Sequence, residues 1–82
     1  MAATKQDIEE WFKQGVREKA THMIVVCDTF DWDDYPVYVK KGDDVRTEQA
    51  KRNGANMQQV MEVYNLKKPM DKQMKEGRCF SY

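Results

Sequence analysis

The stretch THMIVVCD at residues 21–28 decides the fold class of this chain. Its centre, Met23 to Val26, is a run of four apolar residues, three of which are β-branched. Such a run is too short for a good helix and is bounded by small or polar residues, which is typical of a buried β-strand. We therefore expect residues 21–28 to form a strand that runs through the middle of a sheet.

The segments on either side predict an antiparallel hairpin and an amino-terminal helix. Residues 35–41 form a second strand, in which Pro36 must lie at the start or on an edge because it cannot donate a ladder hydrogen bond. The loop between the two strands, residues 29–34, suits an antiparallel connection. Residues 2–19 form an amphipathic helix, with Thr4 as N-cap and Asp7 in a capping-box position.

Two helices are predicted after the hairpin. Asp43 or Asp44 can cap the first, which ends at Arg52 ahead of an Asn-Gly pair. The second begins at Asn56 and covers residues 56–64, where apolar side chains recur at i, i+3, i+4 and i+7, the spacing of one helix face. These side chains are Met57, Val60, Met61 and Tyr64.

A short helical turn at residues 71–76 and a third strand at residues 78–82 complete the expected elements. The resulting order along the chain is α-β-β-α-α-β. We therefore predict one small α+β domain over residues 1–82, built as a three-stranded antiparallel sheet packed by helices.

The composition excludes several classes of protein. Fourteen Lys and Arg residues balance fourteen Asp and Glu residues, so the chain does not coat nucleic acid or anionic membranes by charge alone. With 34% charged residues and a mean hydropathy of −0.93, no apolar run approaches the roughly 20 residues that span a bilayer. The two cysteines, Cys27 and Cys79, indicate reduced thiols rather than a disulfide framework, with a single bridge between them left open.

The neutral total hides an uneven distribution of charge. Residues 1–39 contain four basic and eight acidic groups, a net −4, whereas residues 40–82 contain ten and six, a net +4. This separation permits self-association into a homo-oligomer, or a surface with one acidic and one basic pole. The alternative is that separate solvated faces happen to segregate along the chain.

The loop after the first strand is a candidate interaction site. It holds four carboxylates: Asp28, Asp31, Asp33 and Asp34. Carboxylate oxygens suit a hard divalent cation, but the segment lacks the glycine and the final glutamate of an EF-hand, so we expect no metal site. The alternative is a solvated loop in which Asp28 or Asp31 forms an Asx turn.

Aromatic and basic residues in and after this loop suggest a second possibility, a nucleotide site. Trp32 and Tyr35 either fold back over the sheet or offer a platform on which a base stacks. Basic residues of the following helix would then hold phosphate. The candidate ligand-binding set is Trp32, Tyr35, Arg46, Lys51 and Arg52.

No pattern in the sequence supports catalysis. His22 and Cys27 have opposite parity along the first strand, so their side chains point to opposite faces and do not form a nucleophile–base pair. The chain contains no Gly-rich phosphate loop, no Gly-x-Ser-x-Gly and no Cys-x-x-Cys. We expect a protein that is not an enzyme and has no cofactor.

Three segments together, IVVCDTFD (24–31), DYPVYV (34–39) and NMQQVMEVYNL (56–66), resemble a group of small proteins encoded by tailed bacteriophages and prophages. The resemblance implies a viral protein that acts in the cytoplasm of the bacterial host, and it carries no catalytic motif. By analogy with small phage accessory proteins, it implies a binding protein that counters host defence. The expected mode is sequestration of a nucleotide immune signal. The alternative is that loop 28–34 binds and blocks a host protein.

Overall fold

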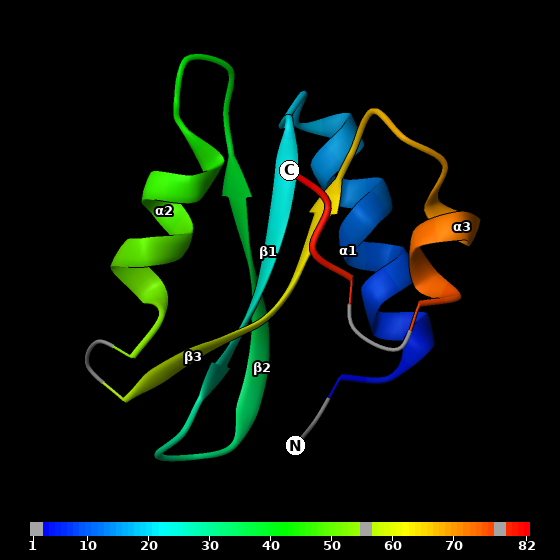
Figure 1. Cartoon of the computed structure of the whole chain (residues 1–82). Helices are drawn as coiled ribbons and strands as arrows, with labels where there is room; N and C mark the ends of the chain where they lie inside the picture. The colour runs from blue at the N-terminus through cyan, green and yellow to red at the C-terminus, as the bar shows by residue number, and fades with distance from the viewer. Residues whose placement is uncertain (1–2, 55–56, 77–78) are drawn as a thin grey trace.

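Strand β1 (His22–Asp28) lies at the centre of a three-stranded antiparallel sheet, between β2 (Asp33–Val39) and β3 (Gln58–Asn65). The computed structural model describes residues 3–54, 57–76 and 79–82. Within these ranges the helices are α1 (Lys5–Arg17), α2 (Val45–Arg52) and α3 (Met70–Met74) (Figure 1). The α+β class, the antiparallel hairpin and the central position of the apolar strand are confirmed. None of these helices is long and apolar enough to cross a membrane.

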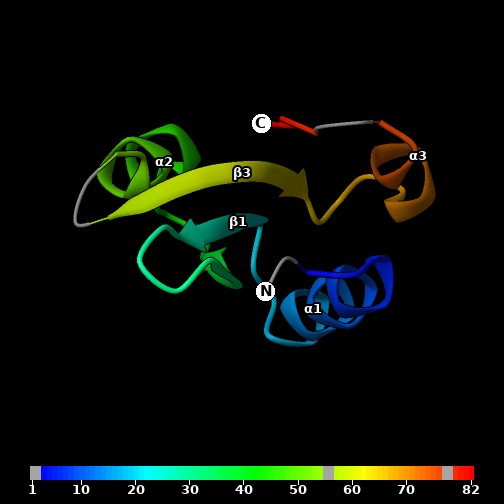
Figure 2. The same ribbon diagram turned by 90° about the horizontal axis from the view of Figure 1, so that it is seen from below.

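Both faces of the sheet are covered, which explains why β1 is apolar without alternation. Met23 and Val25 point into a core shared with α1 and α3, whereas Ile24 and Val26 point into a second core closed by α2. All four side chains are at most 1% exposed. Figure 2 shows the same arrangement, with α1 and α3 on one side of the sheet and α2 on the other. A strand buried on both faces needs apolar residues at every position.

Helix α1 begins with the predicted capping box. Thr4 Oγ1 accepts the Asp7 N–H and Asp7 Oδ2 accepts the Thr4 N–H, both at 3.1 Å. The apolar face of the helix buries Ile8 and Phe12, and the ring of Phe12 meets Tyr64 of β3 edge-on at 6.4 Å between centroids. The helix is shorter than the expected residues 2–19 because the cap fixes its start at Lys5 and a turn follows Arg17.

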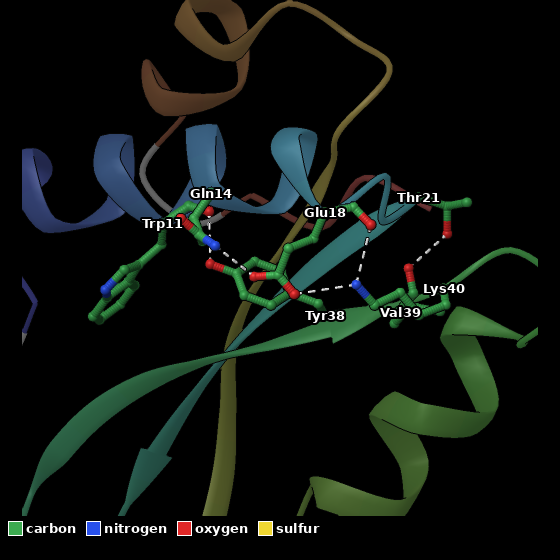
Figure 3. A network of polar contacts seen from close by, with 7 residues as sticks. All are labelled: Trp11, Gln14, Glu18, Thr21, Tyr38, Val39 and Lys40. Atoms are coloured by element: carbon green, nitrogen blue, oxygen red, sulfur yellow. Dashed lines mark hydrogen bonds and ion pairs between the residues drawn. The ribbon is translucent and has the colours of Figure 1, made fainter.

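Polar contacts attach α1 to strand β2 (Figure 3). The Tyr38 hydroxyl donates to the main-chain carbonyl of Trp11 at 2.8 Å. Lys40, just after β2, donates from Nζ to both the carboxylate and the carbonyl of Glu18 at 3.2 Å. These contacts attach the end of β2 to the second half of α1 on one face of the sheet.

The segment predicted as a second helix is strand β3, so this prediction is wrong over residues 58–64. A β-bulge lies opposite the step from Val25 to Val26, where the partner changes from Glu62 to Val60. The extra residue places Val60 and Val63 in the α2-side core. A bulge thus creates a three-residue repeat inside a strand, and that spacing imitates a helix face. The predicted start at Asn56 lies outside the described residues.

The prediction of a third strand at residues 78–82 is also wrong. Phe80 forms one isolated parallel bridge with Val63. The Val63 N–H donates to the Cys79 carbonyl at 2.8 Å, and the Val63 carbonyl accepts the Ser81 N–H at 2.9 Å. Because residues 58–65 supply the third strand, the order of elements is α-β-β-α-β-α. The start of the predicted segment, Arg78, lies outside the described residues. A short helix is present close to the expected place, as α3 at residues 70–74.

Gly15 marks the closest approach between α1 and its neighbours. A Cβ at this position would lie 2.7 Å from Leu66 Cδ1 and 2.8 Å from Tyr38 Cε1. The Tyr38 ring cannot simply move aside, because its hydroxyl is bonded to the carbonyl of Trp11. Glycine at this helical position is therefore a packing requirement, although it lowers intrinsic helix propensity.

We predict that Gly15→Ala destabilises the protein by about 1–3 kcal/mol, because the added methyl group overpacks the α1–β2 contact. The same substitution at an exposed helical position would stabilise by up to about 1 kcal/mol. Urea unfolding followed by circular dichroism measures the difference. Lys13→Ala, on the exposed side of α1, is the control and should stay within about 0.5 kcal/mol of the parent. A Gly15→Ala protein that is more stable than the parent would contradict the prediction.

Candidate interaction surface

The connection between β1 and β2 is a tight turn held by its own backbone and by Asp28. Asp28 Oδ1 accepts the Phe30 N–H at 2.8 Å, and the Asp28 carbonyl accepts the Trp32 N–H at 2.6 Å. The Asx turn considered for Asp28 is therefore present. Strand β2 begins at Asp33, so the loop is shorter than the expected residues 29–34. The turn directs Phe30 and Trp32 into solvent, 71% and 63% exposed.

A second loop is bonded to this turn and adds another exposed apolar side chain. The carbonyl of Met57 accepts the Thr29 N–H at 2.7 Å and the Thr29 hydroxyl at 2.8 Å. The Met57 side chain is 59% exposed. Figure 1 shows the β1–β2 turn and the start of β3 at the same end of the sheet. Phe30, Trp32 and Met57 together form a surface that we call the apolar tip.

The backbone of the apolar tip is strained. Trp32 and Met57 both have φ of 59°, in the left-handed region. Such a conformation costs about 1–3 kcal/mol for a residue with a side chain and persists only where the surroundings enforce it. Here the hydrogen bonds from Thr29 and to Asp28 enforce it. The tip is consequently held in one shape before any partner arrives.

Carboxylates surround the apolar tip. Asp31 and Asp33 are exposed, whereas Asp28 is used in the turn and Asp34 Oδ2 accepts the Ala3 N–H at 2.9 Å. Two of the four predicted interaction residues thus also have structural roles. Within residues 3–54, 57–76 and 79–82, no group of three or more His, Cys, Asp or Glu side chains is arranged to hold a metal ion.

The structure does not bring Arg46 to Trp32. The Arg46 guanidinium lies over the ring of Tyr82, 4.4 Å from its centroid. Tyr82 in turn accepts a hydrogen bond from Asn65, which pairs with His22 at the beginning of β1. Trp32 follows the other end of that strand. A base stacked on Trp32 would therefore not reach the Arg46 guanidinium as placed.

The remaining residues of the predicted nucleotide set are also dispersed. Tyr35 is half-buried and packs against the α2-side core. Of the two placements considered for it, it therefore adopts the one in which the ring folds back over the sheet. Lys51 is exposed and forms an ion pair with Glu48 at 3.4 Å. Arg52 is half-buried at the end of α2. Trp32 is thus grouped with Phe30 and Met57 instead of with phosphate-binding side chains.

The two cysteines are free and buried, so the bridge left open by the sequence is absent. Burial is the main reason that the pKa of each thiol is raised above its ordinary value. A raised thiol pKa keeps sulfur protonated at neutral pH and removes its nucleophilic character. Cys27 pairs with Gln59 across the sheet, whereas Cys79 lies beside Val63 and Gln73. Neither thiol has the environment of a catalytic nucleophile.

The surroundings of His22 favour its neutral form. Its Nδ1 lies 3.0 Å from Thr21 Oγ1, and its Nε2 is buried. Burial is the largest cause that lowers the pKa of His22, and the positive charges of Lys67 and Lys68 lower it further. The backbone of Tyr82 acts in the opposite direction.

Two members of the apolar tip were not among the predicted site residues. Phe30 carried the same signal as Trp32, an aromatic side chain in a polar loop, and could have been found. Met57 was placed on an apolar helix face, but it lies just before β3, where its side chain is exposed. The tip needed the contact between Thr29 and Met57, which joins residues 28 positions apart.

Comparisons with known proteins identify no family: no family model, curated protein or solved structure matches the chain. The resemblance to phage proteins stays an expectation. Function is therefore inferred from the geometry of the described residues.

We predict that protonation of His22 destabilises the fold. The pKa of His22 is lower in the folded chain than in the unfolded chain, so the unfolded chain binds the proton more readily. The stability that neutral His22 contributes is fully present above about pH 6.5 and is lost as the pH falls through the folded pKa. His22→Asn keeps a polar atom near Thr21 but does not titrate. Urea unfolding at pH 7.5 and pH 5.5 should show a larger loss of stability for the parent than for this variant. Equal losses in the two proteins would contradict the prediction.

Proposed function

We propose that this chain is a non-enzymatic binding protein that docks on another protein through the apolar tip. The observation that carries the proposal is that Phe30, Trp32 and Met57, from two loops, are exposed together and held in place by two hydrogen bonds from Thr29. Large exposed aromatic side chains and methionine are the residues enriched at the energetic centre of protein interfaces. A strained, preformed surface loses little entropy on binding.

The charge around the tip favours a basic partner. Asp31 and Asp33 are exposed beside it, and Asp28 and Asp34 add negative potential at the same end of the sheet. A local acidic rim attracts a positively charged site and speeds association, even though the whole chain is neutral. The partner surface that fits is therefore a basic site with an apolar centre.

A protein partner accounts for the placement of Trp32 better than a nucleotide does. A nucleotide site needs a cationic side chain close to the stacking ring, and Arg46 is engaged by Tyr82 toward the other end of the sheet. Trp32 lies at the same end of the sheet as Phe30, Met57 and the carboxylates of loop 28–34. Those carboxylates repel phosphate. The acidic loop is thus better suited to block a protein, the alternative drawn from the sequence.

The setting of this activity comes from the resemblance to phage proteins. In that setting the protein acts in the cytoplasm of the bacterial host and counters host defence by masking a host protein. The size and chemistry of the apolar tip suit the masking of a basic site, such as one that contacts nucleic acid.

We predict that Trp32→Ala raises the dissociation constant of the complex by about thirtyfold or more, as expected when a central aromatic anchor is removed. The chain is immobilised, the retained host protein is identified, and calorimetry with the purified pair gives the constant. Val16→Ala is the matched control, because Val16 is 50% exposed on α1, away from the tip. It should leave the affinity unchanged.

Two outcomes would overturn the proposal. One is a partner whose affinity is the same for Trp32→Ala and the parent. The other is a rise in melting temperature with a cyclic di- or oligonucleotide that is lost in Arg46→Ala, since stabilisation by a ligand reports binding to the folded state. The second result would favour sequestration of a nucleotide signal.

A further inference from the structure

Strand β2 forms one edge of the sheet and pairs on one side with β1. The Thr21 N–H donates to the Val39 carbonyl at 2.7 Å, so the backbone of Val39 faces the β1 side. Because backbone groups alternate along a strand, the odd-numbered residues of β2 face β1 and the even-numbered residues face outward. Pro36 has no N–H, and its backbone nitrogen therefore faces the outer edge, where no donor to β1 is needed and proline is tolerated.

The apolar face beside this edge is incompletely covered. Helix α2 packs over β1 and β3. Tyr35 and Val37, on the same face of β2, are only half-buried. A strand edge with outward-facing polar groups and adjacent apolar side chains is a template for another strand.

The sequence along β2 indicates which strand fits. Strand β2 begins with Asp33 and Asp34, and Lys40 and Lys41 directly follow its last residue, Val39. Within the protomer, Lys40 pairs with Glu18 and Asp34 accepts the Ala3 N–H, so their contacts with a second copy would add to these bonds. When a second copy of this strand runs antiparallel with Val37 opposite Val37, Asp33 faces Lys41 and Asp34 faces Lys40. The two-fold symmetry repeats both pairings. Opposite charges directly across a strand pair stabilise it, and like charges destabilise it.

This register also suits the backbone. The Tyr38 N–H of each copy can donate to the Pro36 carbonyl of the other, because both groups face outward. Moving the symmetry axis to Pro36 would place two residues without donors opposite each other and would put Asp34 opposite Tyr38. Of these two registers, the one centred on Val37 is favoured by hydrogen bonding and by charge.

We propose that β2 pairs with β2 of a second copy, with Val37 on the two-fold axis, and joins two three-stranded sheets into one continuous sheet. Tyr35 then lies opposite Val39, which is buried in its own core, and the half-buried Tyr35 and Val37 side chains of each copy supply the apolar contact at the joint. The two apolar tips point away from each other at opposite ends of the joined sheet. Phe30, Trp32 and Met57 do not belong to this contact, whereas Asp33 and Asp34 belong both to it and to the acidic rim of the apolar tip.

A cysteine at the axis tests the register. Residues directly opposite in an antiparallel pair have Cα atoms about 4.5–5.5 Å apart, within the range that a disulfide bridges. Val37→Cys should therefore form a covalent dimer under mild oxidation, while native Cys27 and Cys79 stay buried. Val16→Cys is the matched control, because the Val16 side chain is exposed on α1. This variant should remain monomeric on a non-reducing gel.

Charge exchange tests the same contact without a crosslink. Lys41→Glu places like charges opposite each other twice, and we expect it to raise the dimer dissociation constant about tenfold. Adding Asp33→Lys to this variant restores the opposite charges and should restore the affinity. Lys72→Glu makes the same charge change at an exposed residue of α3 and should leave the dimer dissociation constant unchanged. Sedimentation equilibrium across a dilution series measures all four proteins.

The proposal is overturned if the parent chain is monomeric throughout the dilution series, or if Val16→Cys crosslinks as completely as Val37→Cys. It is also overturned if Lys72→Glu weakens the dimer as much as Lys41→Glu does. Trp32→Ala should leave the dimer intact. A loss of partner binding with an intact dimer, or the reverse, therefore separates failure of this inference from failure of the docking proposal.

Discussion

The burial of β1 on both faces is the constraint on which the rest of the structure depends. Met23 and Val25 need cover on one side of the sheet, and Ile24 and Val26 need it on the other. Each such side chain gains about 1.5–3 kcal/mol when fully buried. A chain of 82 residues has few elements with which to cover two faces. Helices α1 and α3 cover one face, α2 covers the other, and β2 and β3 complete the sheet.

The same constraint accounts for the ends of the sheet. With β1 in the middle and antiparallel neighbours on both sides, the β1–β2 turn and the start of β3 must lie together. Thr29 binds the carbonyl of Met57 at this point, and both loops adopt strained conformations that expose their side chains. The apolar tip is thus a product of the topology.

The candidate site was only partly predictable. Trp32 and the carboxylates of loop 28–34 were found, because an aromatic residue among acidic residues stands out in any sequence. Their grouping with Met57 was missed, since it depends on a contact across 28 residues. The sequence did not determine whether Arg46 lies close to Trp32. In the fold, Arg46 is turned toward Tyr82.

The sequence by itself determined the elements whose signals are local. These are the capped helix that Thr4 begins, the apolar strand at residues 22–28 and the hairpin that follows it. Only the tertiary structure decided the state of residues 58–65, because their apolar spacing is compatible with a helix face and with a bulged strand. The need for a strand beside β1, and for apolar side chains on both faces of the sheet, selects the strand. Local propensity is weak compared with such burial, and for that reason it did not decide the outcome here.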